Sequence, residues 1–264
     1  MKKSKKYSRA RRTRRKNRGK DMRGGDNTAP DRTYIFLLPY RARSPNEVRR
    51  QEIMNALDSI TSYFPAKKIP YTVIVVEQNN DDPFNKGLIL NAGFIESEKY
   101  NTMPRIYVHM NVDYILDTSR EFPQELNDFT KGFIEIYNMN LDNNLPVTYI
   151  GGGCAFDPDS YKRVNGFPND IWGWGGEDNA LRERVLRRGV PHTVNSLANN
   201  GWMKAQNSSA PRNTSKVDDN QKKAFNITDT TGIDGCDYTI DGAGEFNDDR
   251  KGIRHVLINF KYTT

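Results

Sequence analysis

From residue 33 onward, short apolar runs alternate with stretches of helical periodicity. The apolar runs are bounded by turn residues, and the run at 71–76 is rich in β-branched side chains, which is typical of buried strands. The predicted strands span residues 34–38, 71–76, 105–109, 147–150 and 252–262. Strands that alternate with helices form a sheet with helices on its faces, so we predict an α/β fold with a mixed, mainly parallel sheet.

Helical periodicity fills the segments between these strands. The first helix opens near residue 44, and its apolar side chains share one face: Val48, Ile53, Leu57 and Ile60. Residues 87–100 predict a second helix, Asp159 is expected to cap a short third helix, and residues 178–188 predict a fourth that ends at Gly189. Residues 195–230 are rich in Asn, Ser, Thr and Lys, so we expect a long loop there, which would act as a mobile lid.

Basic residues concentrate at the N-terminus. Residues 1–23 contain 13 Lys or Arg and one acid, a balance of +12, whereas the remainder carries −5. Because the segment has almost no apolar side chains, we expect residues 1–30 to be a disordered tail and residues 31–264 to form a single domain. Such a tail binds nucleic acid nonspecifically, acts as a nuclear-localisation signal or lies on an anionic surface; a solvated tail without a partner is the alternative.

The sequence contains no run of about 18 apolar residues, and no apolar segment follows the N-terminal charges. It therefore predicts neither a transmembrane segment nor a signal peptide. Cys154 and Cys236 are the only cysteines, which allows one disulfide at most and no zinc cluster. We expect a cytoplasmic protein, or one associated with a host-cell cytosol or a particle.

A glycine-rich segment, Trp172-Gly-Trp-Gly-Gly-Glu-Asp-Asn179, combines two indoles with two acidic side chains. An indole offers an apolar plate to a sugar ring, the glycines let a ligand approach the backbone, and Asp178 can act as a general base. The alternative is a tight turn with two core tryptophans. The adjacent carboxylates of Glu177 and Asp178 favour a sugar site.

Three further segments lie at the ends of predicted strands, where open α/β sheets bind their ligands. They are Pro39-Tyr-Arg-Ala-Arg43, Asn111-Val-Asp113 and Gly151 to Gly153. Arg41 and Arg43 can clamp phosphate oxygens. Tyr40 can stack on a base, and Asp113 can hold a divalent ion on a diphosphate. Together these segments predict an anionic ligand bridged by a metal.

Five motifs, in order along the chain, resemble those of the β-1,4-galactosyltransferase family of inverting, nucleotide-sugar-dependent enzymes with a GT-A fold. They are Leu38-Pro-Tyr-Arg-Ala-Arg43, Phe84-Asn-Lys-Gly-Leu-Ile-Leu-Asn-Ala-Gly-Phe94, Asn111-Val-Asp113, Tyr149-Ile-Gly-Gly152 and Asn165-Gly-Phe-Pro-Asn-Asp-Ile-Trp-Gly-Trp-Gly-Gly-Glu-Asp178. The resemblance covers residues 33 to 260. It implies a metal-dependent hexosyltransferase that moves a hexose from a UDP-sugar to a sugar hydroxyl with inversion, forming a β-linkage. Because the sequence predicts no membrane segment, we expect a soluble member of this family.

The resemblance also implies a role for each matching residue, with Asp178 as the catalytic base. The implied donor-binding residues are Pro39, Tyr40, Arg41, Arg43, Phe84, Lys86, Asp113 and Gly152. The implied acceptor-binding residues are Tyr149, Trp174, Gly175, Gly176, Glu177, Asp178 and Asn179. The implied ligands of a divalent cation, Mn²⁺ or alternatively Mg²⁺, are Asp113, Met203 and Gln206.

Four positions depart from the family pattern. Asn111 replaces an aspartate and Lys86 an arginine near the donor, so both galactose and glucose stay open as the hexose. Gln206 replaces a metal-binding histidine, and a neutral amide is a poorer ligand than imidazole. Asn179 replaces a second aspartate, so the acceptor is a glycan or glycosylated molecule of unspecified sugar. These departures leave the alternative of a noncatalytic nucleotide- or sugar-binding protein with a degenerate metal site.

Overall fold

The computed structural model describes most of the chain from Arg32 onward. The described residues are 32–42, 47–99, 104–137, 149–150, 152–193, 201–207, 214–226, 231–242 and 253–260. Two predictions lie outside them, namely the disordered tail and the phosphate contact of Arg43. Within the described part of the chain, no helix combines the length and apolar character needed to cross a membrane.

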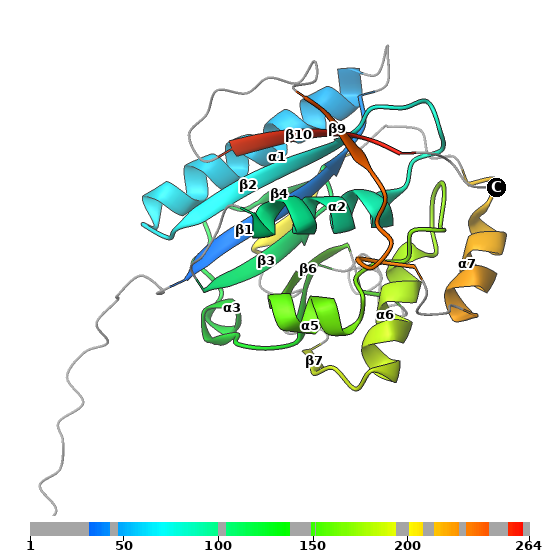
Figure 1. Ribbon diagram of the computed structural model, residues 1–264. Helices are drawn as coiled ribbons and strands as arrows, with labels where there is room; N and C mark the ends of the chain where they lie inside the picture. The colour runs from blue at the N-terminus through cyan, green and yellow to red at the C-terminus, as the bar shows by residue number, and fades with distance from the viewer. Residues whose placement is uncertain are drawn as a thin grey trace, which may run out of the picture.

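A mixed eight-stranded sheet forms the centre of the molecule, with the strand order β7-β5-β6-β3-β1-β2-β10-β9 (Figure 1). The parallel part consists of β1 (Thr33–Tyr40), β2 (Tyr71–Gln78), β3 (Arg105–Met110) and β10 (Ile253–Asn259). Three antiparallel pairings extend it through β6 (Gly153–Phe156), β5 (Phe133–Tyr137) and β9 (Thr239–Gly242). A short edge strand, β7 (His192–Thr193), runs parallel to β5.

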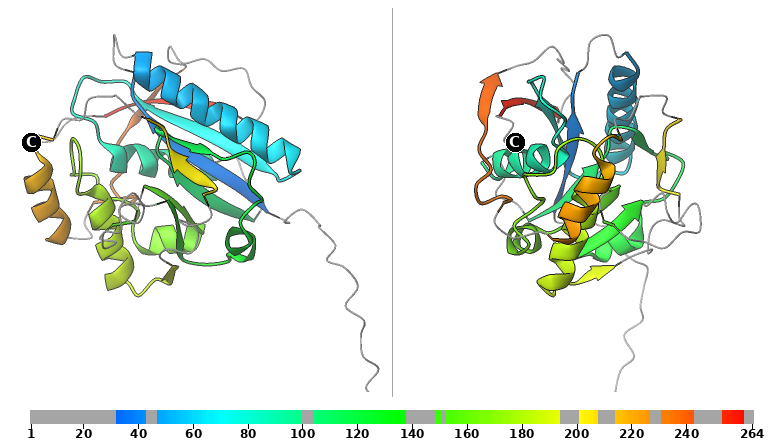
Figure 2. Two further views of the ribbon diagram at one scale, coloured as in Figure 1. Left: turned by 180° about the vertical axis from the view of Figure 1, so that it is seen from behind. Right: turned by 90° about the vertical axis from the view of Figure 1, so that its right-hand side faces the viewer.

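Helices cover both faces of this sheet, and α1 and α2 lie on opposite sides of β1 (Figure 2). Alternate residues of β1 point to the two faces because the side-chain period of a strand is two. Phe36 and Leu38 pack with α1 (Glu47–Ala66), whereas Ile35 and Leu37 pack with α2 (Lys86–Glu98). Burial on both faces explains why these strands are continuous apolar runs.

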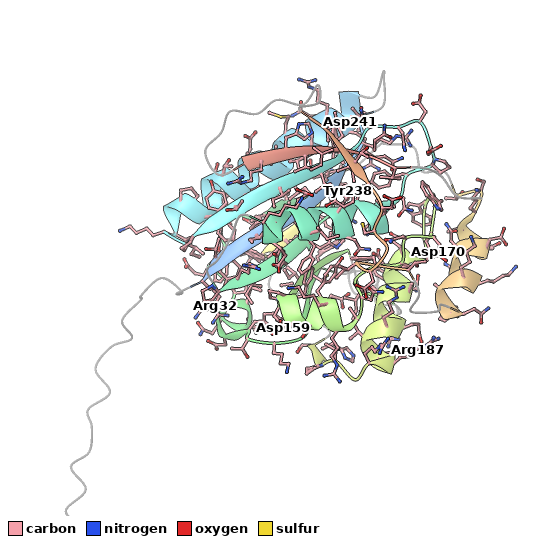
Figure 3. The ribbon with its side chains drawn as sticks, in the orientation of Figure 1. Arg32, Asp159, Asp170, Arg187, Tyr238 and Asp241 are labelled. Carbon is pink, nitrogen blue, oxygen red and sulfur yellow. The ribbon has the colours of Figure 1, made fainter. Side chains whose placement is uncertain are left out.

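Shorter elements complete the fold around this sheet. They are β4 (Tyr114–Leu116), α3 (Gln124–Asp128), α5 (Pro158–Arg163), α6 (Glu177–Arg187), β8 (Met203–Ala205) and α7 (Val217–Phe225). Strands β4 and β8 pair antiparallel as a separate two-stranded ribbon. Tyr238, labelled in Figure 3, contacts α2 by donating a hydrogen bond to Glu96.

The predicted α/β fold is confirmed, and three local predictions are wrong. Residues 149–150 are not in a strand; the strand begins at Gly153 and runs antiparallel to β3. The short helix α5 is capped by Asp157, whose carboxylate accepts from two backbone N–H groups, and not by Asp159. The expected loop 195–230 contains β8 and α7 among its described residues.

Candidate active site

The carboxyl ends of β1, β2 and β3 meet the start of β6, because β6 is antiparallel to β3 and Met110 pairs with Gly153. This register brings Asn111 to Asp113 and Gly152 to the same edge of the sheet. The approach is close: a Cβ on Gly152 would lie 3.0 Å from the Tyr114 hydroxyl. A side chain at residue 152 would therefore require this neighbour to shift, which gives Gly152 a packing role besides its predicted ligand contact.

Helix α2 holds the loop before the tryptophan segment. The Asn91 side chain donates to the Phe167 carbonyl and accepts from the Tyr161 hydroxyl and the Phe167 N–H, at 2.7 to 3.1 Å. The Asn85 side chain caps α2 and also donates to the Asn169 carbonyl. A Cβ on Gly87 would meet the Pro168 carbonyl oxygen at 2.4 Å. Two sequence motifs far apart in the chain thus form one packed unit.

The two tryptophans of the glycine-rich segment have different environments. Trp172 is 5 % exposed and packs against the Phe260 ring, whereas Trp174 is 45 % exposed. Trp172 is therefore a core tryptophan, and of the two indoles only that of Trp174 is exposed to solvent. The N–H of Gly173 donates to the Phe84 carbonyl at 2.8 Å, so the predicted donor residue Phe84 lies directly under this segment.

Helix α7 packs on the two glycines that precede α6. A Cβ on Gly176, whose φ is +94°, would lie 2.6 Å from the Asn220 carbonyl oxygen, and one on Gly175 would meet Val217 at 2.8 Å. The Asn220 amide also donates to the Trp172 carbonyl at 3.0 Å. Both glycines are therefore required for the packing of α7, and their contact with an acceptor stays a prediction.

Three charged side chains meet at the N-terminus of α6. The Lys86 ammonium donates to both Asp178 oxygens at 2.8 and 3.0 Å and lies 3.3 Å from Glu177. The Asp178 side chain keeps 19 % exposure, about twice that of Lys86. Burial raises the pKa of Asp178 to about 7, and the Glu177 charge adds to the rise while Lys86 opposes it. A carboxyl group with such a pKa can accept a proton near neutral pH.

Tyr114 lies close enough to Asp113 and Asp178 for both charges to affect it. Burial raises the pKa of Tyr114 well above its ordinary value, and the charges of Asp113 and Asp178 add to that shift. Tyr149 contributes to the same shift, and the next residue, Ile150, donates its N–H to the Asp178 carbonyl at 3.3 Å. The predicted donor-side and acceptor-side residues thus share one electrostatic neighbourhood.

His109 is fully buried beside this neighbourhood. Burial lowers its pKa well below the ordinary value, and the Lys86 charge lowers it further. Its Nε2 lies 3.2 Å from the Asn111 amide oxygen, so a neutral histidine faces the residue that replaces the family's aspartate. His109 is a packed core histidine.

The residues predicted to bind the nucleotide lie at the end of β1 and directly after it. Pro39 and Tyr40 are buried, and the Tyr40 ring, 3 % exposed, belongs to the core on the α1 side. Stacking of this ring on a base would require its displacement, so that role stays a prediction. Arg41 donates to the Asp82 carbonyl, and the Ala42 N–H approaches the Glu77 carboxylate at 3.3 Å.

The Gln206 carboxamide forms hydrogen bonds to other residues of the protein. Its Nε2 donates to the carbonyls of Glu52 and Val112, each at 3.0 Å, and its Oε1 accepts from Asn55 at 2.9 Å. Its backbone N–H donates to the Asp113 carbonyl at 2.7 Å. Gln206 thus joins α1 to the turn that carries Asp113, and a role as a metal ligand stays a prediction.

The residues present fit a cation that protein and donor hold jointly. The described part of the chain contains no group of three or more His, Cys, Asp or Glu side chains that could enclose a metal ion. Asp113 offers a carboxylate, which suits Mn²⁺ and Mg²⁺. The Met203 sulfur lies over Gly153, where a Cβ would approach it to 2.4 Å. Diphosphate oxygens of a donor would complete such a site.

Several residues that position the site escaped the sequence prediction. Asn85 and Asn91 clamp the loop before Trp172, Tyr114 joins the two halves, and Asn220 supports the glycine turn. The available signals were a cap residue, Asn85, directly before the predicted helix and a polar residue, Asn91, among its apolar positions. Asn179, the second residue after Glu177 in α6, is partly exposed, and its acceptor contact stays a prediction.

The sheet, with a carboxylate after β3 and a second at the start of α6, has the architecture of the GT-A glycosyltransferases. Two family models match the chain: the N-terminal region of glycosyl transferase group 7 over residues 4–122, and the N-terminal domain of galactosyltransferase over residues 133–199. The chain belongs to the β-1,4-galactosyltransferase family.

Curated relatives and a solved structure agree with this assignment. The chain is 29 % identical to human β-1,4-galactosyltransferase 2 over 64 % of its length and 45 % of the relative's. It is 33 % identical to zebrafish β-1,4-galactosyltransferase 5 over 57 % of its length and 37 % of the relative's. It therefore spans less than half the length of these relatives. The catalytic domain of Drosophila β-1,4-galactosyltransferase 7 shares the fold, with a TM-score of 0.68, 19 % identity, and coverage of 88 % of this chain and 95 % of that one.

Proposed function

We propose that this chain is an inverting glycosyltransferase that moves a hexose, galactose first and glucose as the alternative, from a UDP-sugar to a sugar hydroxyl, forming a β-linkage. The Asp178 carboxylate carries the proposal, because it is partly exposed, has a pKa of about 7 and lies in the segment of the exposed Trp174. Family membership supports it. A solved Drosophila relative holds manganese, UDP-Gal and xylobiose.

In this mechanism Asp178 removes the proton of the acceptor hydroxyl. The acceptor oxygen then attacks the anomeric carbon from the face opposite the diphosphate, the bond to the diphosphate oxygen breaks, and configuration inverts without a covalent enzyme intermediate. Lys86 holds both Asp178 oxygens and so fixes the direction of the carboxylate. The Trp174 indole would stack on the acceptor ring and orient its hydroxyl toward Asp178.

On the donor side, Arg41 and Arg43 would neutralise the diphosphate, and Asp113 with Met203 would hold a divalent cation. That cation, when bound, neutralises the charge that develops on the leaving diphosphate. Gly152 lets the β6 strand approach Tyr114 closely, which keeps the cation side and the base side together.

A panel of UDP-hexoses with Mn²⁺ or Mg²⁺, assayed for hydrolysis and for transfer to small sugar acceptors, tests the proposal. Asp178→Asn should lower kcat by roughly 10²–10⁴-fold while UDP binding persists, because only proton removal is lost. Asp170→Asn is the matched control, since Asp170 is exposed on the loop before Trp172 (Figure 3). Unchanged turnover in a folded Asp178→Asn variant would refute the assignment of the base.

A noncatalytic nucleotide- or sugar-binding protein is the second candidate. The engagement of the Gln206 carboxamide with Asn55, Glu52 and Val112 favours it, because this amide is turned to the protein. Calorimetry separates the two candidates. Nucleotide binding that is indifferent to Mn²⁺, together with no turnover of any UDP-hexose, would support the second candidate and exclude the first.

The basic tail is a separate proposal. Residues 1–23, with a charge of +12, would attach the protein nonspecifically to nucleic acid or to another anionic surface in a cytoplasmic setting. Deletion of residues 1–26 should abolish salt-sensitive binding to such polyanions and leave transfer to a small acceptor unchanged. Loss of transfer in the deleted protein would show that the tail serves the reaction itself.

A further inference from the structure

Arg49, in the first turns of α1, lies beside the turn that carries Asp113. Its Nη1 donates to Glu52 Oε2 at 2.7 Å and lies 3.9 Å from Asp113 Oδ2. The Glu52 side chain is 5 % exposed, whereas the Arg49 side chain keeps 24 % exposure. A buried carboxylate therefore anchors a guanidinium that still reaches solvent, next to the predicted metal ligand.

The contact between α1 and the Asp113 turn is fixed by further hydrogen bonds. Gln206 bridges the carbonyl of Glu52 on α1 and that of Val112 in the turn. The N–H of Leu116 in β4 donates to the Ser59 hydroxyl of α1 at 3.1 Å. Because these bonds hold the part of α1 that follows Arg49 against the Asp113 turn, the proximity of the Arg49 guanidinium to Asp113 is a property of the fold.

We propose that Arg49 is a donor-binding residue that shares Asp113 with the divalent cation. Before ligands bind, the guanidinium pairs with Asp113 and keeps that carboxylate in place. With a cation held at Asp113, Arg49 would remain anchored by Glu52 and turn toward the diphosphate of the donor. This inference rests on the proposed function.

The positive charge of Arg49 has opposite effects on the binding of a cation and on the binding of the diphosphate. A guanidinium near Asp113 repels a divalent cation and competes for its carboxylate ligand, so it weakens metal binding to the empty site. The same positive charge attracts the diphosphate, and its planar fork can bond two oxygens at once. Arg49 would therefore make cation binding depend on the donor, because the anionic donor removes the repulsion.

Arg49→Met tests this inference with two binding measurements on the full chain. Mn²⁺ binding without nucleotide, followed by electron paramagnetic resonance of free Mn²⁺, should tighten by roughly tenfold. UDP binding at saturating Mn²⁺, measured by calorimetry, should weaken by roughly tenfold. Arg49→Lys keeps the charge but loses the fork, so it should leave Mn²⁺ binding near that of the unmodified protein and weaken UDP binding only partly.

Arg50→Met is the matched control, because Arg50 is the exposed neighbour on the same helix, and it should change neither affinity. Two results would overturn the inference: unchanged affinities in folded Arg49→Met, or shifts of both affinities in the same direction. A protein that binds Mn²⁺ and UDP but transfers no hexose would refute the proposed function alone, and the two Arg49 shifts would still decide the binding role.

Discussion

Lys86→Met removes the cation that holds the proposed base. In the native protein the Lys86 ammonium lies about 3 Å from both Asp178 oxygens and opposes the rise of the Asp178 pKa, which stands at about 7. Methionine keeps much of the length of the side chain but cannot donate a hydrogen bond. The variant should therefore retain its packing on α2 and lose only the ion pair.

Coulomb's law sets the magnitude of this change. Two unit charges 3 Å apart at an effective dielectric constant of about 20 interact by roughly 5 kcal/mol. Solvent reaches the 19 %-exposed Asp178 carboxylate and reduces this value, so we expect a further rise in its pKa of about two units. The base would then be protonated at neutral pH.

The pH profile of kcat/KM measures this shift, because the rate rises as the base loses its proton. We expect an acidic limb with a midpoint near 7 in the unmodified protein and near 9 in Lys86→Met. Lys86→Arg is the control and should keep the midpoint near 7. A midpoint in Lys86→Met that is unchanged or lower would refute the role of Lys86 in tuning Asp178.

Three further predictions concern Asp178, the tryptophans and the α2 clamp. The folded-state pKa of Asp178, about 7, exceeds its ordinary value of 3.8. The contribution of Asp178 to folding stability is therefore present at low pH and is lost as pH rises from about 4 to about 7. Chemical denaturation across this range should show that Asp178→Asn weakens the decline in unfolding free energy. Trp174→Ala should raise the acceptor KM with less than about 0.5 kcal/mol change in unfolding free energy, whereas Trp172→Ala should cost about 3–5 kcal/mol; equal stability losses would contradict the two environments. Asn91→Ala leaves buried partners unsatisfied and should cost about 3 kcal/mol in denaturant unfolding, and a neutral effect would refute the clamp.

Local patterns were sufficient for the parallel part of the sheet and its main helices. The strands β1, β2 and β3 were predicted because each is buried on both faces and so reads as a continuous apolar run. Strand β10 was predicted as well, although only its residues Leu257 and Ile258 are buried. Strands β4, β5, β7, β8 and β9 were missed. Strand β5 lies in the sheet between β6 and the edge strand β7. Strand β4 is only three residues long, so it is recognised by its pairing with β8 and not by its own sequence.

Helix α7 was missed for a similar reason. Its sequence is largely polar, and its buried side chains are only Asn220 and Ala224, so hydrophobic periodicity is weak. Its position is decided by packing against Gly175 and Gly176, far from it in the sequence. The same packing requires glycine at both positions.

The sequence by itself determined the fold class, the family and the residue types of the site, because these depend on local periodicity and on motifs in a fixed order. Only the tertiary structure decided which side chains meet. It separated Trp172 in the core from the exposed Trp174, joined Lys86 to Asp178, and turned the Gln206 amide toward α1. Burial and pKa depend on neighbours that lie dozens of residues away, and no local pattern encodes those distances.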